Sequence, residues 1–144
     1  MMKGASLREW ETQSAGPTTI LLVEDEEAVR SMAKMFLERN GYSVIEAESG
    51  SDAVAIWEKK QSQIDLLVTD LIMPGEFTGQ KLARRLQCDR PDLKVIFSSG
   101  YDCEDFAESE SDYLDLESNF LQKPYRLSSL SQMIRELLET ENVT

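Results

Sequence analysis

The chain has 144 residues, which suits one domain of ordinary size and falls short of what two domains usually need. Hydrophobic residues make up 41% and charged residues 29%, a balance typical of soluble globular proteins that excludes collagen-like, disulfide-rich and low-complexity classes. The formal net charge of −12 has the wrong sign for a nucleic-acid backbone or an anionic membrane, so we expect neither as a partner.

Rare and missing residue types narrow the chemistry further. The chain has no histidine, which removes histidine-based acid–base catalysis, histidine-ligated zinc and a phosphohistidine intermediate. Cys88 and Cys103 lack metal-site spacing and no secretory segment is recognisable, so we expect unpaired thiols in a reducing cytoplasm. No apolar run approaches the ~18 residues of a membrane span, and no direct membrane contact is expected.

Strand-like apolar runs alternate with helix-period segments after the first turn-forming stretch. Residues 1–17 are predicted to be a linker or flexible arm, residues 18–141 a single domain, and residues 142–144 a tail. The apolar runs are nearly continuous, as expected for parallel strands covered on both faces. They begin near Thr19, Ser43, Ile64, Lys94 and Asn119.

Amphipathic segments between these runs predict the covering helices. The first closes at Asn40-Gly41, and its apolar stripe consists of Val29, Met32, Ala33, Phe36 and Leu37. A second helix is expected from Ser49 to about Gln61, and a third begins at Thr78 as the N-cap. Between Asp102 and Glu117 the chain has eight acidic residues and no basic one, where we expect a short helix; the last helix spans Leu127 to Leu138.

Five βα units with short, right-handed connections predict the fold class. The expected architecture is an α/β, flavodoxin-like, doubly wound (βα)5 sandwich with a five-stranded parallel sheet in the order 2-1-3-4-5. In such a sheet, a site forms outside the carboxyl ends of the strands where the strand order reverses. The residues that follow each strand therefore indicate the chemistry.

Polar groups follow four of the predicted strands. Glu24 and Asp25 come after the first strand, Asp70 after the third, Ser99 after the fourth and Lys123 after the fifth. Carboxylates gathered at the ends of apolar runs repel one another, and a hard divalent cation such as Mg²⁺ relieves that repulsion. The lysine adds a second, fixed positive charge, so the pattern predicts a cation site at this edge.

Each of these residues also has a purely structural interpretation. Asp25 could cap the following helix, with Glu24 favoured by the helix dipole. Asp70 and Ser99 could be turn residues, and Lys123 a solvated charge. Matched oxygen and ammonium groups at four separate strand ends would then be a coincidence, so we favour the site.

Four segments carry a resemblance to a known family. They read LLVEDE from Leu21, DLLVTDLIMPG from Asp65, VIFSSGY from Val95 and FLQKP from Phe120. Together they resemble the receiver domain of two-component response regulators, over residues 18–141. The extra residue before Gly79 and the long acidic segment after the third motif narrow the resemblance to receivers attached to hybrid sensor histidine kinases.

The resemblance implies a role for the central carboxylates. Asp70 would be the phosphoacceptor, taking a phosphoryl group from the phosphohistidine of a histidine kinase or phosphotransfer protein. Glu24, Asp25, Asp70 and the backbone carbonyl of Ile72 would hold Mg²⁺, with Mn²⁺ as a substitute. Because Glu24 stands where the family more often has aspartate, its contact with the metal is expected to run through a water. Phosphorylation would switch a protein-interaction surface.

The resemblance also implies roles around the phosphoryl group. Lys123 and Ser99 would bind it, and Ser99 with Phe120 would form the switch; serine in place of the more frequent threonine loosens that coupling. Ile72 and Tyr101 flank the route of water, so we expect a long phosphate lifetime. The domain would catalyse its own Mg²⁺-dependent phosphorylation and dephosphorylation, either alone or fused to a kinase domain upstream.

Three other functions are weighed against this one. A hydrolase with an aspartyl nucleophile on a similar sheet needs an acid two residues after the nucleophile, where this chain has Ile72. Nucleotide binding needs a glycine-rich loop after the first strand, where Glu24-Asp25-Glu26 stands instead. A receiver-like module that binds partners without being phosphorylated stays open as the alternative.

Overall fold

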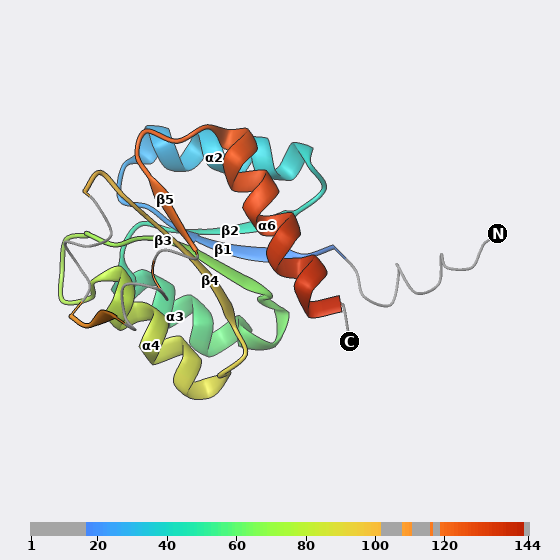
Figure 1. The fold of residues 1–144 in the computed structure, drawn as a ribbon. Coiled ribbons are helices and arrows are strands. Elements are labelled where there is room, and N and C mark those ends of the chain that lie inside the picture. Colours follow the sequence, from blue (N-terminus) through green and yellow to red (C-terminus); the bar gives the residue numbers. More distant parts are fainter. Residues whose placement is uncertain (1–16, 102–107, 111–115, 117–118, 143–144) are drawn as a thin grey trace.

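Five parallel strands form one sheet in the order β2-β1-β3-β4-β5 (Figure 1). The structure is a computed structural model that describes residues 17–101, 108–110, 116 and 119–142. Its elements are β1 (Thr19–Val23), α2 (Glu27–Arg39), β2 (Ser43–Ala47), α3 (Gly50–Lys60), η1 (Gln61–Gln63), β3 (Leu66–Asp70), α4 (Gly79–Asp89), β4 (Lys94–Ser99), β5 (Phe120–Gln122) and α6 (Leu127–Asn142). The predicted doubly wound fold and its strand order are confirmed.

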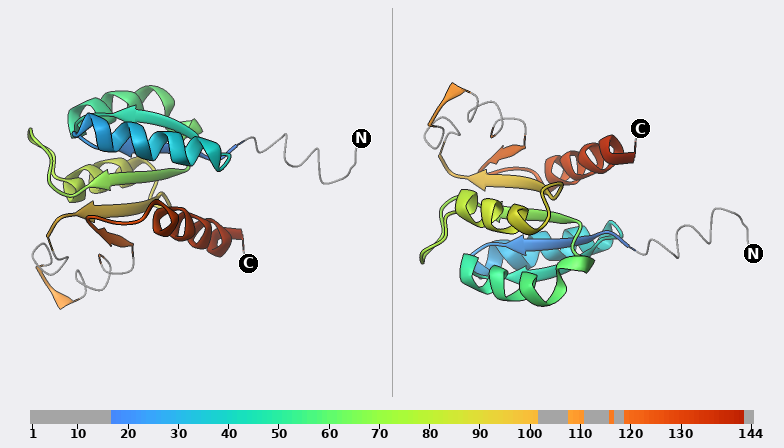
Figure 2. Two further views of the ribbon diagram at one scale, coloured as in Figure 1. Left: turned by 90° about the horizontal axis from the view of Figure 1, so that it is seen from above. Right: turned by 90° about the horizontal axis from the view of Figure 1, so that it is seen from below.

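The sheet is buried between two layers of helices. Helices α2 and α6 cover one face, and α3 and α4 cover the other (Figures 1 and 2). Alternate residues of β1 serve the two cores: Ile20 and Leu22 pack with the α2 and α6 side, while Leu21 and Val23 pack with the α3 and α4 side. This two-sided burial explains why the strand sequences read as continuous apolar runs.

Capping side chains fix where two of the helices begin. The Ser49 hydroxyl accepts the Asp52 backbone N–H at 3.1 Å, and the Thr78 hydroxyl accepts the Lys81 N–H at 3.1 Å. The predicted start at Thr78 is therefore confirmed. The N-cap of α2 is Glu26, without a side-chain capping bond, so the reading of Asp25 as a helix cap is wrong.

Two details of the core differ from the sequence pattern. Met32, predicted on the buried stripe of α2, is 62% exposed, because the sheet-facing stripe is narrower and centres on Ala33 and Leu37. Strand β3 begins at Leu66 rather than near Ile64. The Arg90 guanidinium bonds the carbonyl oxygens of Gln61 and Ile64, which holds that stretch in a turn outside the strand.

Several predictions fall wholly or mainly on residues outside the described ranges. They concern the arm over 1–17 apart from Pro17, the acidic segment apart from residues 108–110 and 116, and Cys103. Cys88 is a free, exposed thiol, as expected. Across the described parts of the chain, no helix is long and apolar enough to span a bilayer.

Candidate functional site

The carboxyl ends of β1, β3, β4 and β5 meet at one edge of the sheet (Figure 2). Backbone hydrogen bonds extend the pairing just past the strands: the Leu71 N–H donates to the Ser98 carbonyl at 2.8 Å, and the Lys123 N–H donates to the Ser99 carbonyl at 2.7 Å. The first residues of the loops are thereby held as firmly as the strands themselves. The side chains that follow these strands therefore converge from fixed backbone positions.

Three carboxylates form the centre of the site. One oxygen each from Glu24, Asp25 and Asp70 lies within 4.8 Å of the other two. Glu24 and Asp70 are buried, at 4% and 7% exposure, whereas Asp25 is exposed. Mg²⁺ binds oxygen ligands at about 2.1 Å in an octahedral shell, so oxygens at this separation can share one ion. The donor set fits a hard divalent cation.

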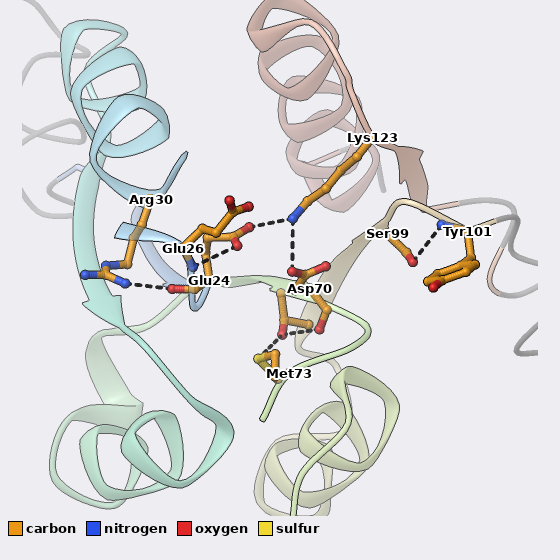
Figure 3. A network of polar contacts seen from close by, with 9 residues as sticks. Glu24, Glu26, Arg30, Asp70, Met73, Ser99, Tyr101 and Lys123 are labelled. Carbon is orange, nitrogen blue, oxygen red and sulfur yellow. Dashed lines mark hydrogen bonds and ion pairs between the residues drawn. The ribbon is translucent and has the colours of Figure 1, made fainter. Parts of the chain in front are cut away.

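Lys123 lies against the two buried carboxylates (Figure 3). Its ammonium nitrogen is 2.9 Å from Glu24 Oε1 and 3.0 Å from Asp70 Oδ2. Burial lowers the pKa of Lys123, but the hydrogen bonds to Glu24 and Asp70 outweigh it and hold the pKa above its ordinary value. The side chain is therefore a permanent positive charge beside Asp70.

The Asp70 carboxyl has a raised pKa and therefore ionises at a higher pH than an ordinary aspartate. Burial raises its pKa from the ordinary 3.8 to about 6; the Lys123 hydrogen bond opposes that rise, and the Glu24 and Asp25 charges add to it. One positive charge thus offsets the repulsion in part, and a divalent cation would offset the rest. The local electrostatics agree with the chemistry of the donor set.

A close backbone approach fixes the loop after Asp70. The Gly79 N–H donates to the Leu71 carbonyl at 2.8 Å, and a Cβ at Gly79 would lie 2.4 Å from the Asp70 carbonyl oxygen. The buried Thr69 hydroxyl lies 2.9 Å from that same oxygen and 3.8 Å from the Met73 sulfur. The loop that contains Ile72 is therefore tied down at both of its ends.

Ser99 and Phe120 lie on the neighbouring strands. The buried Ser99 hydroxyl accepts the Tyr101 N–H at 3.1 Å, and Figure 3 shows it beside the carboxylate cluster rather than within it. Phe120 is half-buried with Phe97, its register partner, and packs against the buried pair Leu71 and Leu116. The aromatic ring thus packs against a cluster that includes the residue directly following Asp70.

Ile72 and Tyr101 come two residues after Asp70 and Ser99, respectively. Their exposed fractions are 49% and 61%, although both are large and apolar or aromatic. The residues predicted from the sequence therefore form two sets. Glu24, Asp25, Asp70 and Lys123 make up a carboxylate–lysine cluster. Ile72, Ser99, Tyr101 and Phe120 lie on the adjacent strands and loops.

Sequence reasoning missed two features next to the cluster. Arg30, on α2, donates to the backbone carbonyl of Glu24 at 2.7 Å (Figure 3). An apolar groove of about 500 Å³ lies between α2 and the segment after β5, lined in part by Val29, Met32, Tyr125 and Lys123. The sequence contained one indication of the groove: Met32, an apolar residue at the margin of the α2 stripe.

The chain is similar to known signalling proteins. The model of the response regulator receiver domain family matches residues 20–135. The sensor kinase CckA of Brucella abortus is 40% identical over 131 residues, which are 91% of this chain and 14% of that protein. The response regulator receiver protein CpdR of the same organism is 34% identical, over 83% of this chain and 95% of that protein.

Solved structures similar to this chain also include a receiver domain and a response regulator protein. The receiver domain of the hybrid histidine kinase CckA has a TM-score of 0.68 and 36% identity, covering 83% of this chain and 98% of that chain. The response regulator protein TrrA of Thermotoga maritima, solved in complex with Mg²⁺ and BeF, has a TM-score of 0.69 and 25% identity, covering 83% and 98%.

The raised pKa of Asp70 predicts a pH-dependent stability. The folded protein retains the Asp70 proton up to about pH 6, whereas the unfolded chain releases it near 3.8, so the stability linked to that proton is present at low pH and lost as the pH rises through 6. Relative to an Asp70→Asn variant, the metal-free protein should lose about 1 kcal/mol between roughly pH 5 and pH 8. Urea denaturation of both proteins in EDTA measures this; a difference that stays constant with pH would contradict it.

Proposed function

Because this chain belongs to the response regulator receiver domain family, we propose that it accepts a phosphoryl group on Asp70 in a two-component phosphorelay. Receiver domains pair with histidine kinases or phosphotransfer proteins and bind Mg²⁺ in an acidic pocket. The observation that carries the proposal is the buried Asp70 carboxylate, with the Lys123 ammonium at 3.0 Å and two further acidic side chains within ligand-sharing distance.

The proposed reaction needs little beyond this cluster. An Asp70 oxygen attacks the phosphorus of a phosphohistidine; the new P–O bond forms as the P–N bond breaks, and the imidazole nitrogen keeps the electron pair and takes a proton from water. Asp25, Asp70, the Ile72 carbonyl and, through a water, Glu24 would hold Mg²⁺, which would supply positive charge to neutralise the phosphoryl oxygens. Mn²⁺ has the same preference for oxygen ligands and would substitute.

Lys123 and Ser99 would bind the product. The Lys123 ammonium, now shared by Glu24 and Asp70, would pair with a phosphoryl oxygen when Asp70 is modified. The Ser99 hydroxyl now accepts a bond from the Tyr101 N–H, and its own proton is available to donate to the phosphoryl group after a small rotation. Phe120, which packs against the cluster of Leu71 and Leu116, would respond to that movement as the switch residue.

The apolar groove supports a protein partner as the phosphoryl donor. Lys123 belongs both to the groove wall and to the carboxylate cluster, so a partner seated in the groove would contact the side chain that bonds Asp70. The exposed Met32 and the half-buried Tyr125 offer adaptable apolar contacts there. We propose a histidine kinase or phosphotransfer protein as the occupant.

Relatives of this domain occur in two kinds of protein. The chain spans 14% of the sensor kinase CckA and 95% of CpdR, so its counterparts occur inside a large kinase and in a small receiver protein. We propose that residues 18–141 form the folding unit, whose last helix continues to Asn142, that residues 1–17 act as a linker, and that the domain acts in the cytoplasm. A kinase domain fused upstream fits the first context.

Phosphorylation by a small donor tests the proposed function. Incubation with acetyl phosphate and Mg²⁺ should add the mass of one phosphoryl group, which intact-protein mass spectrometry detects. The addition should vanish in Asp70→Asn and persist in the matched control Asp92→Asn, because Asp92 is exposed at the opposite edge, just before β4. An unmodified wild-type protein that still binds a kinase would favour the unphosphorylated, partner-binding alternative.

Removal of the lysine charge should separate metal binding from phosphoryl transfer. A Lys123→Met variant loses the ammonium that stabilises the phosphoryl oxygens, and we expect its phosphorylation rate to fall about 100-fold. Its affinity for Mg²⁺ should rise, because Glu24 and Asp70 then lack their positive partner. Stopped-flow phosphorylation and calorimetric Mg²⁺ titration measure the two effects; parallel losses of both would refute the assigned role.

Ile72 and Tyr101 should set how long the phosphoryl group persists. Both side chains are exposed and come two residues after Asp70 and Ser99, where an apolar and an aromatic side chain would shield the phosphoryl group from attacking water. We therefore expect slow self-dephosphorylation, and an Ile72→Ala variant should hydrolyse several-fold faster, an expected change of about 1 kcal/mol in the barrier. Loss of radiolabel after removal of the donor gives the half-life, and an unchanged half-life would exclude the shielding role.

A further inference from the structure

We propose, on the basis of the magnesium site proposed above, that Arg30 is a positioning residue that holds the metal-binding loop after β1. Its guanidinium reaches back from α2 to the turn that contains Glu24 and Asp25 (Figure 3). By fixing the backbone between these two acids, Arg30 keeps both carboxylates directed at Asp70. No ligand role is assigned to Arg30 itself.

The guanidinium bridges two elements with two separate donors. Its Nη1 donates to the Glu24 carbonyl oxygen at 2.7 Å, and its Nε donates to Glu46 Oε1 at 3.1 Å. The Arg30 side chain is 15% exposed, whereas its partner Glu46 is 33% exposed, so the guanidinium itself is largely shielded from water. A planar, forked cation can satisfy two such acceptors at once, which a single ammonium group cannot do with the same geometry.

Hydrogen bonds also fix the backbone N–H and both carboxylate oxygens of Glu24. Its N–H donates to the Ala47 carbonyl at 3.1 Å, its Oε1 accepts from Lys123 at 2.9 Å and its Oε2 accepts from the Glu26 N–H at 3.2 Å. The Arg30 bond to the carbonyl oxygen fixes the remaining group. That carbonyl belongs to the peptide plane joining Glu24 to Asp25, so its orientation sets the direction of both side chains.

Glu46 anchors the guanidinium to the sheet. It lies on β2 in register with Leu22 of β1, one residue before the Ala47 that receives the Glu24 N–H. A hydrogen bond from Lys34, and a weaker effect from Arg30, hold the pKa of Glu46 below its ordinary value although burial opposes them. The anchor is therefore charged at neutral pH, and the end of β2 fixes the metal-binding loop through Arg30.

Lys34 provides a matched control one turn further along α2. Its ammonium nitrogen lies 3.1 Å from Glu46 Oε2, so it shares the anchor with Arg30. Among the contacts of the described residues, Lys34 bonds to Glu46 and makes no hydrogen bond to Glu24. Replacement of either side chain by methionine removes one positive charge from the same helix, but only the Arg30 change releases the Glu24 carbonyl.

Whether the affinity for a divalent cation rises or falls in the Arg30 variant distinguishes a positioning role from a purely electrostatic one. Loss of a positive charge near an acidic cluster should strengthen the binding of a divalent cation, in Arg30→Met and Lys34→Met alike. Loss of positioning should weaken it in Arg30→Met alone. A merely structural role for Arg30 would lower the stability of the metal-free protein and leave the metal dissociation constant unchanged.

Titration with Mn²⁺ followed by electron paramagnetic resonance tests the proposal, because only free Mn²⁺ gives the sharp solution spectrum. We expect the Mn²⁺ dissociation constant of Arg30→Met to rise about tenfold, the lower end of the effect of removing an outer-shell partner. Lys34→Met should bind as tightly as the wild type or slightly more tightly. Urea denaturation in EDTA establishes that each variant is folded.

The outcomes distinguish this inference from the proposed function. If the wild type binds Mn²⁺ no better than an Asp25→Asn variant, the metal site itself is refuted. If the wild type binds at this site and Arg30→Met binds equally or more tightly, the positioning role is overturned. Should Arg30→Met fail to fold, Arg30→Lys decides: it keeps the charge, so binding several-fold weaker than wild type supports the role and equal binding overturns it.

Discussion

The mutual repulsion of three carboxylates at one edge of the sheet is the constraint around which this domain is organised. Glu24, Asp25 and Asp70 bring three negative charges together, and Lys123 returns one positive charge, leaving a formal −2. Two of the acids are buried, where unpaired charge is unfavourable. A divalent cation would bring this formal charge to zero.

The topology of the sheet places this repulsion at one point. Strands β1 and β3 are adjacent, but α2 leaves towards one face and α4 towards the other (Figure 1). The loops after the two strands diverge there and leave room for a ligand. The fold thus supplies the crevice, and the cores on both faces supply the rigidity that keeps Glu24 and Asp70 close despite their charges.

Helix α2 connects the acidic site with the molecular surface. Its Arg30 contacts the Glu24 backbone, while Val29 and Met32 line the apolar groove beside Lys123. A partner seated in that groove would therefore contact the helix whose Arg30 bonds the Glu24 backbone. The same arrangement would serve a receiver inside a kinase such as CckA and a small receiver protein such as CpdR, since groove and cluster both lie within one domain.

Local sequence signals predict most of the fold and the residues of the carboxylate–lysine cluster. Apolar runs, the hydroxyl caps at Ser49 and Thr78 and the residues after each strand are local signals, and parallel strands necessarily bring their carboxyl ends together. The exposure of Met32 and the bond from Arg30 to Glu24 depend on how distant segments pack, so the sequence does not predict them. Helical periodicity predicts which side of α2 is apolar, but not how much of that side the sheet covers. The Arg30 contact depends on Glu46 of another strand, and no periodic pattern in the sequence indicates such a contact.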